Sequence, residues 1–230
     1  DDTVERKYLS VLYRAMMQEQ VELVICGMKL VRPSITEINI ARKGLITIGS
    51  EDADHFVELN QKYLLYGPVV KLYRADIIKS KNIEFPLGVH YGEDLIFNFK
   101  YLEYVNRIFI IDSPVYTYRI LSSGTLSSST HSRDVTNNYS QWKIIRSFFE
   151  RKKINTISAK IYLSNRLWGI AYDLVMSNDL TLKDIENAFS PGFETDLKTF
   201  NKYTIAIPGW LKLAISKRLY RLMWLIQRRA

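Results

Sequence analysis

The spacing of apolar residues changes several times along the first part of the chain. Residues 3–20 place apolar side chains near helical spacing after an acidic start, and so predict a helix. Its apolar positions are Val4, Leu9, Leu12 and Met16. Residues 21–31 (VELVICGMKLV) are rich in β-branched residues and predict one buried strand. Residues 32–50 predict a loop or an exposed hairpin, with turns at Gly44 and Gly49.

The pattern returns to helical spacing near Ser50, which we expect to be the N-cap of a second helix. Gly67-Pro68 ends that helix, and residues 69–82 predict a short strand or turn that leads into another helix. The elements predicted next are a loop over residues 84–94, a helix over 96–106, and two strands over 107–120 that break at Ser113-Pro114.

Beyond about residue 134 the chain is helical, in stretches that cover residues 137–153, 158–177 and 181–189. Pro191-Gly192 and Pro208-Gly209 interrupt the end. The small-residue stretch 121–132 predicts a mobile loop. The pattern therefore predicts an α/β unit over residues 1–130 and a helical extension over 131–230. The extension holds five aromatic residues that we expect in a core rather than in a sugar-stacking platform: Trp142, Phe148, Phe149, Trp168 and Tyr172.

Composition narrows the class of protein. Of 230 residues, 47% are apolar and 24% charged, which is typical of a globular chain, and no run of eighteen apolar residues predicts a transmembrane helix. The N-terminal residues do not resemble a signal peptide. A lone cysteine, Cys26, lies in an apolar run, so we expect a buried thiol, no disulfide framework and a reducing cytoplasm.

The net charge of +8 suggests an anionic partner, for which nucleic acid, an anionic membrane and a pyrophosphate-bearing substrate are all candidates. Residues 212–229 hold six Lys or Arg and no acidic residue, and apolar residues recur there near helical spacing. Such a helix suits an anionic membrane surface, with Trp210 and Trp224 as interfacial anchors. A helix packed on its own domain, with a solvated basic face, explains the same pattern.

Two acidic pairs are candidates for chemistry: Asp1-Asp2 at the start, and Glu93-Asp94 after a glycine at the head of a helix. Hard carboxylate oxygens bind Mg²⁺ or Mn²⁺, which neutralises a leaving diphosphate. A positioned carboxylate can also remove the proton from an acceptor hydroxyl. The helix dipole by itself favours an acidic pair at a helix N-terminus, so the dipeptide alone is weak evidence.

The order of several motifs is more specific. GPVVKLYRADII, then IEFPLGVHYGEDLIFNFKYL, then RIFIIDSPVYTYRILSSGTLS resembles the second half of family 2 glycosyltransferases, which are inverting enzymes with the GT-A fold, common in bacterial polysaccharide synthesis. The opening DDTVERKYLSVLYRAM resembles the segment that comes after the Asp-x-Asp motif in that family. The resemblance covers roughly residues 1–130 and implies an incomplete GT-A domain of α/β class, followed by the helical extension.

The resemblance also implies roles for single residues. Asp1, with Asp2 beside it, would hold the metal, Mn²⁺ or Mg²⁺. Asp94 would be the catalytic base, supported by Glu93. The residues implied to contact substrate are Lys71, Arg74, His90, Arg119 and Ser127, with Arg119 and Ser127 near the diphosphate because an arginine fork matches phosphate oxygens. Ordinary surface or structural charges explain Lys71, Arg74 and Arg119 equally well, and a solvent-exposed loop explains His90.

The chain departs from the family in two places. Val69-Val70 stands where the family has Trp-Asn or a similar pair, which affects acceptor contacts there. The chain also begins inside the metal motif, so we expect the upstream half, which cradles the nucleotide in a GT-A enzyme, to be missing.

The sequence thus predicts a metal-dependent, inverting glycosyltransferase of hexosyltransferase type. Its donor would be a nucleotide-diphosphate sugar, with UDP as the expected nucleotide. Its acceptor would be a glycan or a lipid-linked glycan, and its location the cytoplasm at the inner face of the cell membrane. A non-catalytic membrane-surface or partner-binding module with the same fold is the alternative. A nucleic-acid-binding protein is disfavoured, because no RNA or DNA motif is visible and the basic residues gather at one end.

Overall fold

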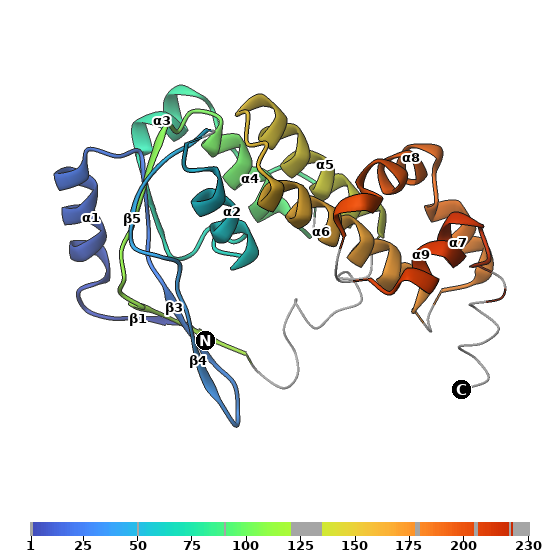
Figure 1. Cartoon of the computed structure of the whole chain (residues 1–230). Coiled ribbons are helices and arrows are strands. Elements are labelled where there is room, and N and C mark those ends of the chain that lie inside the picture. Colours follow the sequence, from blue (N-terminus) through green and yellow to red (C-terminus); the bar gives the residue numbers. More distant parts are fainter. Residues whose placement is uncertain are drawn as a thin grey trace. The chain divides into compact units, whose positions relative to one another are not determined.

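The chain divides into two compact units. The first consists of Asp1–Ser129 and Ser147–Thr156, and the second of Thr130–Arg146 and Ile157–Ala230. A computed structural model describes residues 2–49, 51–89, 91–120, 135–177, 180–204, 207–220 and 222 (Figure 1).

Two four-stranded mixed sheets form the framework of the first unit. One has the order β5-β7-β2-β6, in which β2 is parallel to β7 and the outer strands are antiparallel. The other has the order β1-β8-β3-β4, with β3 parallel to β8. The strands are β1 (Thr3–Val4), β2 (Leu23–Ile25), β3 (Met28–Val31), β4 (Thr36–Asn39), β5 (Gly44–Thr47), β6 (Lys71–Tyr73), β7 (Arg107–Ile110) and β8 (Tyr116–Arg119).

The single strand predicted over residues 21–31 is wrong, because the run forms β2 and β3, which belong to different sheets. Cys26 and Gly27 separate them. The Cys26 amide donates to the carbonyl of Val70 at 2.9 Å, and the Gly27 amide donates to that of Ser113 at 3.2 Å. A Cβ on Gly27 would lie 2.9 Å from the Ile40 side chain, so only glycine fits this crossing without displacing its neighbour.

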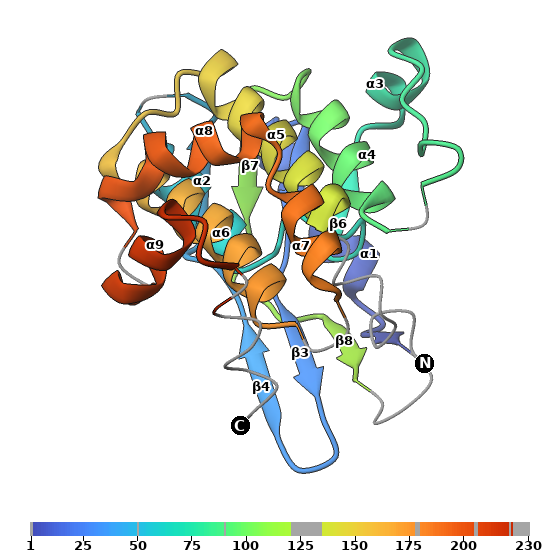
Figure 2. The same ribbon diagram turned by 90° about the vertical axis from the view of Figure 1, so that its right-hand side faces the viewer.

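The predicted hairpin exists, but its turn lies elsewhere. β3 and β4 pair around residues 32–35, where the Arg32 amide donates to the Ile35 carbonyl at 2.9 Å. Gly44 instead begins β5, which pairs with β7. The β3–β4 ribbon extends past the rest of its unit in both views, and β4 is largely exposed (Figures 1 and 2).

The helices of the first unit are α1 (Tyr8–Glu19), α2 (Ala53–Gln61), α3 (Ala75–Ser80) and α4 (Glu93–Leu102). The helix predicted at the start is confirmed for residues 8–19, and Leu12 and Met16 are buried as expected. Val4 and Leu9 were also expected to be buried, but they are 55% and 67% exposed. Val4 belongs to β1 rather than to the helix, and α1 buries only a narrow stripe that leaves Leu9 outside.

The N-cap of α2 is Asp52, whose side chain accepts instead from the Thr47 amide at 2.8 Å. The expected cap, Ser50, lies outside the described residues. The strands predicted on either side of Ser113-Pro114 are confirmed as β7 and β8.

The second unit is helical, as predicted. Its elements are α5 (Val135–Arg151, whose end belongs to the first unit), α6 (Ile157–Val175), α7 (Leu182–Ala188), α8 (Pro191–Phe200), the 3-10 turn η3 (Asn201–Tyr203) and α9 (Gly209–Ser216). The break expected at Pro191-Gly192 is confirmed as the boundary between α7 and α8, and Pro191 begins the second of these helices. Ser190 is the N-cap of α8, its hydroxyl accepts from the Phe193 amide at 3.4 Å, and Pro191 occupies the first turn, where its missing N–H costs nothing.

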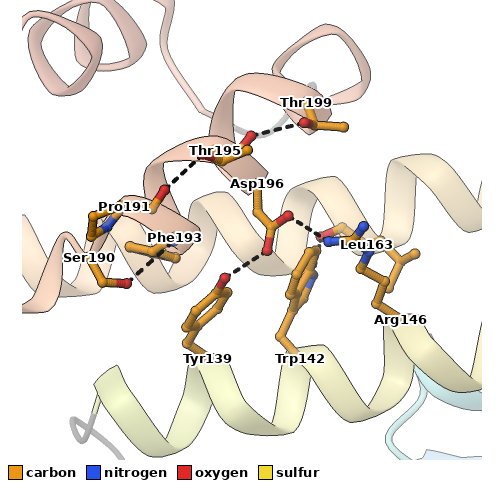
Figure 3. A network of polar contacts seen from close by, with 10 residues as sticks. All are labelled: Tyr139, Trp142, Arg146, Leu163, Ser190, Pro191, Phe193, Thr195, Asp196 and Thr199. Carbon is orange, nitrogen blue, oxygen red and sulfur yellow. Dashed lines mark hydrogen bonds and ion pairs between the residues drawn. The ribbon is translucent and has the colours of Figure 1, made fainter.

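A partly buried set of polar contacts joins α5, α6 and α8 within the second unit (Figure 3). Asp196 accepts from the Tyr139 hydroxyl at 2.7 Å and from the Arg146 guanidinium at 2.5 Å. The Trp142 indole donates to the Leu163 carbonyl at 2.8 Å. Because each donor finds an acceptor, the network fixes the register of the three helices.

The expected aromatic core is confirmed for four of its five members. Trp142, Phe148, Phe149 and Trp168 are each at most 3% exposed, whereas Tyr172 is 38% exposed. Phe148 and Phe149 belong to the first unit, where their ring centroids lie 5.7 and 6.0 Å from that of Phe56. Cys26 is also buried, as predicted.

The basic amphipathic segment packs part of its apolar face inside its own unit. Leu211 and Ile215 of α9 are buried, and Tyr220 stacks on Phe189 with centroids 4.3 Å apart. Trp210 and Leu213 are exposed. Trp224, the second expected anchor, lies outside the described residues. Within the ranges that the structure covers, no helix is both long enough and apolar enough to span a bilayer.

Candidate active site

The carboxyl ends of the parallel strands β2 and β7 define one edge of their sheet. Ile25, the last residue of β2, pairs with Ile110 of β7 and with Lys71, the first residue of β6. Cys26 follows directly. In open α/β sheets this edge is where ligands bind, so the groups gathered there are candidates for function.

Lys71 is a buried cation at this edge, with 6% of its surface exposed. Its ammonium donates to the carbonyls of Gly67 at 2.5 Å and Val69 at 3.3 Å. Burial lowers the pKa of the amine to about 7, against the opposing effects of Cys26 and Asp94. Burial also raises the pKa of the Cys26 thiol to about 12, so the thiol is uncharged at neutral pH and Asp94 is the anion that acts on Lys71.

Asp94 lies in the first turn of α4, directly after Glu93. The helix follows Gly92, whose φ of 85° is a left-handed conformation that glycine adopts without strain. Burial raises the pKa of the Asp94 carboxyl above its usual range, and the charge of Glu93 adds to this effect while Lys71 opposes it. A half-buried carboxylate of raised pKa, within electrostatic reach of an amine, is suited to accept a proton.

Asn98 of α4 holds the loop on which Lys71 depends. Its amide donates to the carbonyls of Tyr66 at 2.8 Å and Gly67 at 3.0 Å, and its oxygen accepts from the Tyr73 hydroxyl at 2.5 Å. The carbonyl of Gly67 therefore accepts hydrogen bonds from both Asn98 and Lys71. Helix α4 thus carries the candidate base, Asp94. Through Asn98 it also positions the cationic neighbour of that base, Lys71.

The structure also brings Asp2 and Arg119 together. The Asp2 carboxylate accepts from the Tyr116 hydroxyl at 2.7 Å and from the Arg119 amide at 3.0 Å. The pairing of β1 with β8 sets both contacts, and leaves the Arg119 side chain exposed.

Two tyrosines connect Asp2 with the edge of the other sheet. The rings of Tyr116 and Tyr8 lie 6.2 Å apart. Burial raises the pKa of Tyr8 to about 12, with Cys26 adding to the effect, so Tyr8 lies within electrostatic reach of the thiol. Neither tyrosine is among the site residues that the sequence predicts. Tyr116 has a signal, since it opens the Tyr-Thr-Tyr-Arg motif, but nothing local distinguishes Tyr8.

The remaining predicted residues are not part of this cluster. The exposed guanidinium of Arg74 is paired with Asp76, at 2.6 and 3.0 Å, which raises its pKa further. His90, Ser127 and Asp1 lie outside the described residues.

Val70, one of the two residues that depart from the family pattern, is fully buried at a φ of 60°. This conformation costs a β-branched residue on the order of 1–3 kcal/mol. The departure therefore places a strained, buried residue directly before Lys71.

Of the two residues expected to hold a metal, Asp1 and Asp2, the structure describes Asp2. Each Asp2 oxygen accepts one hydrogen bond and retains a lone pair for a hard cation. Among the residues described, however, no group of three or more His, Cys, Asp or Glu side chains is arranged to hold a metal ion. Asp1, the expected neighbour of Asp2, lies outside the described residues.

We expect the stability of the protein to depend on pH through Lys71. Between pH 7 and the ordinary lysine value of 10.5, the unfolded chain binds a proton on Lys71 that the folded chain has released. The unfolding free energy of the wild type, relative to Lys71→Met, should therefore rise with pH in this window by up to about 1.4 kcal/mol per unit. Urea titrations across the window measure it.

Lys100→Met, at an exposed position of α4, is the matched control and should show a flat difference. A flat difference for Lys71→Met as well would mean that folding does not lower the pKa of Lys71.

Comparisons with known proteins bear on the fold. No family model matches the chain, and no curated protein matches its sequence. Among solved structures, S. aureus TarS 1–349 in complex with UDP-GlcNAc aligns at a TM-score of 0.64 and 16% identity, over 100% of this chain and 66% of that one. The complex of the same protein with UDP aligns at 0.56 and 17% identity, over 100% and 64%.

A further structure of S. aureus TarS aligns at a TM-score of 0.53 and 15% identity, over 98% of this chain and 38% of that one. This chain thus spans about two thirds or less of the structures it resembles. TarS is a glycosyltransferase, and the likeness confirms a mixed α/β fold that resembles a nucleotide-sugar transferase.

Proposed function

We propose that this chain carries the acceptor side and the catalytic base of an inverting, family 2 glycosyltransferase, which moves a sugar from a nucleotide-diphosphate sugar to a hydroxyl of a glycan or a lipid-linked glycan. The observation that supports it most is Asp94, a half-buried carboxylate of raised pKa, opposed to the buried cation Lys71 at the carboxyl edge of β2. The likeness to a glycosyltransferase supports it at the level of the fold.

In this mechanism Asp94 accepts the proton of the acceptor hydroxyl as the hydroxyl oxygen attacks the anomeric carbon. The bond between that carbon and the diphosphate oxygen breaks, and its electron pair leaves with the nucleotide diphosphate. Attack from the face opposite the leaving group inverts the anomeric centre. A carboxylate with a raised pKa is the stronger base, so the burial of Asp94 favours the proton transfer.

Lys71 keeps this base ionised. Its charge opposes the effects of burial and of Glu93 on the Asp94 carboxyl. Because Lys71 is held by the Gly67 carbonyl, and that carbonyl by Asn98, the cation stays near the carboxylate without forming a hydrogen bond that would compete with the acceptor.

A divalent cation, Mn²⁺ or Mg²⁺, would neutralise the leaving diphosphate when bound. Asp2, with Asp1, would hold it. The exposed guanidinium of Arg119 beside Asp2 would contact the diphosphate, together with Ser127. Glu93 supports Asp94, and Arg74 and His90 would lie at the acceptor rim.

The donor we propose is UDP-linked, since the TarS structures contain UDP-GlcNAc and UDP. For the setting we propose the synthesis of a bacterial surface polysaccharide at the cytoplasmic face of the cell membrane.

Calorimetric titration of UDP with and without Mn²⁺ tests the donor side. We expect metal-dependent binding that Asp2→Ala weakens at least about tenfold, since loss of a charged ligand to a bound group costs more than about 1.4 kcal/mol. Asp112→Ala removes an exposed carboxylate paired with Lys43 and should leave binding unchanged. Thermal unfolding of each variant controls for the contacts that Asp2 makes with Tyr116 and Arg119.

UDP binding that is equal with and without Mn²⁺, or equal in Asp2→Ala, would contradict a metal at Asp2. Absence of any UDP binding would favour the alternative, a non-catalytic module that retains the fold.

A further inference from the structure

Helix α9 of the second unit is apolar on two sides. Leu211 and Ile215 are buried and fix the helix within its own unit. Trp210 and Leu213 are 64% and 59% exposed, and their spacing of three residues places them on one face of the helix. The packing of α9 therefore does not need this second face. Large apolar side chains that are exposed side by side, rather than singly, mark interaction surfaces.

The exposure of apolar side chains continues beyond α9. Leu219 and Leu222 are 44% and 54% exposed. Tyr220 between them is buried and stacks on Phe189, so this segment is also fixed to the helical unit. The proposed transfer reaction uses none of these side chains.

Three lysines lie near the exposed face of α9. An open groove beside α9 is lined by Lys198 of α8, Lys202 of η3 and Leu213. Lys217, the C-cap residue of α9, follows Leu213 by four positions and so extends the same face. All three lysines are exposed, and among the described residues none of them has an ion-pair partner.

Carboxylates are rare on this part of the chain. Residues 197–230 contain eight Lys or Arg and no Asp or Glu. Among the described residues that line the groove, Glu194 is the single carboxylate, and the Arg218 guanidinium pairs with it at 2.6 Å. The exposed lysines are held by no rigid frame, which suits a surface with many negative charges better than one small anion in a fixed position.

We propose that Trp210, Leu213, Lys198, Lys202 and Lys217, here called the α9 surface, dock the protein on an anionic phospholipid membrane. The rings of tryptophan prefer the boundary between headgroups and acyl chains, where the leucine side chain also leaves water. Lysines near such a surface are attracted by the lipid phosphates. A nucleic acid would use the lysines but would offer no apolar region to Leu213, so the combination favours a membrane.

Flotation of the intact protein with lipid vesicles tests this inference. One set of vesicles contains equal parts of phosphatidylcholine and phosphatidylglycerol, and the other phosphatidylcholine alone. We expect partitioning onto the mixed vesicles to be at least about tenfold stronger, because each lysine near an anionic surface contributes about fivefold.

A first pair of variants tests the apolar contacts. Trp210→Ala combined with Leu213→Ala should weaken binding to the mixed vesicles at least about tenfold, because both side chains would leave water in the bound state. Leu9→Ala combined with Tyr13→Ala is the matched control, since these side chains of α1 are 67% and 60% exposed. The control should bind as the wild type does. Thermal unfolding of each variant shows that the fold is retained.

A second pair of variants tests whether the position of the charges matters. The first variant removes the cations of the α9 surface by Lys198→Gln, Lys202→Gln and Lys217→Gln. The control removes the same charge elsewhere by Lys79→Gln, Lys100→Gln and Lys183→Gln, all at exposed positions. The first should weaken binding at least about tenfold and the control much less.

Tryptophan fluorescence shows whether the indole of Trp210 enters the bilayer. Lipids with brominated acyl chains quench a tryptophan that lies among them. Trp142 and Trp168 are at most 3% exposed and are shielded from such quenching. Vesicle binding should therefore quench part of the emission, and Trp210→Phe should reduce the quenched part. A purely electrostatic contact would give no quenching.

Equal binding to both kinds of vesicle, equal losses in the two lysine variants, or quenching that Trp210→Phe leaves unchanged would each overturn the proposal. Binding to an RNA or DNA oligonucleotide that is tighter than vesicle binding, and that Trp210→Ala with Leu213→Ala leaves unchanged, would assign the lysines to nucleic acid instead. These assays involve no sugar transfer, so failure of the proposed function would leave their results unaffected.

Discussion

Replacing Asp94 by asparagine should lower the rate of sugar transfer by about 10²–10⁴-fold, which is the usual contribution of a positioned general base. Asparagine has nearly the same shape as aspartate, but its amide cannot take the proton of an acceptor hydroxyl. The pKa of Asp94 is raised by burial and by Glu93, so the wild-type rate should fall with acid at a pH above the usual range of an aspartate. The asparagine variant should lose this acid limb.

Steady-state transfer rates, measured across the acid and neutral pH range, test both effects. Asp76→Asn is the matched control, since Asp76 also lies in the first turn of a helix of the first unit but is exposed and paired with Arg74. It should retain the rate and the pH profile. UDP binding should survive in Asp94→Asn. A variant at Asp94 that keeps the wild-type rate would remove Asp94 from the mechanism.

Trp142→Ala should lower the free energy of unfolding by about 3–5 kcal/mol, the usual cost of truncating a fully buried large aromatic residue. Trp142 is 0% exposed in the core of the helical unit. Its ring stacks on Tyr139 with centroids 5.8 Å apart, and its indole donates to the Leu163 carbonyl. The substitution leaves a cavity and removes the indole donor to that carbonyl of α6.

Denaturant titration measures the loss. Trp210→Ala is the matched control, because Trp210 is 64% exposed and its truncation should change stability by less than about 0.5 kcal/mol. Trp142→Phe, which fills most of the space, should cost less than the alanine. Equal effects of Trp142→Ala and Trp210→Ala would contradict the assigned core.

Much of the local structure was predictable, because short-range signals carry it. The Ser113-Pro114 break between β7 and β8 and the helical spacing of α5, α6 and α7 lie in the sequence itself. The division of residues 21–31 into β2 and β3 was not predictable, because one glycine in an apolar run is compatible with a single strand. It depends on the approach of Ile40 to Gly27, a contact that no local pattern records.

The beginning of α8 was predictable only in part. The sequence pattern predicts the interruption between α7 and α8, but not that Ser190 and Pro191 are the N-cap and the first position of a new helix. A proline is compatible both with the end of helical structure and with the first turn of a new helix. The packing of Phe193 and Leu197 into the core decides for the new helix.

The site residues that the motif order implies stay predictions, but the structure brings two of them, Asp94 and Lys71, within electrostatic reach of each other. The motif order identifies Asp94 and Lys71, but burial of Lys71, and hence its lowered pKa, follows from the way Asn98 holds the Gly67 carbonyl. The same motifs include Tyr116, in Tyr-Thr-Tyr-Arg, but nothing in them identifies Tyr8. The proximity of these tyrosines depends on the pairing of β1 with β8, two strands far apart in the chain.

The proposed activity is tested most directly by incubating the protein with UDP-GlcNAc, other UDP-linked sugars and Mn²⁺, in the presence of a panel of glycan and lipid-linked acceptors. The assay follows UDP release and the mass of the acceptor together. The proposed function predicts that one acceptor gains the mass of one sugar for each UDP released, and that Asp94→Asn abolishes both. No UDP release with any donor, or equal transfer by wild type and Asp94→Asn, would contradict a glycosyltransferase that uses Asp94 as its base.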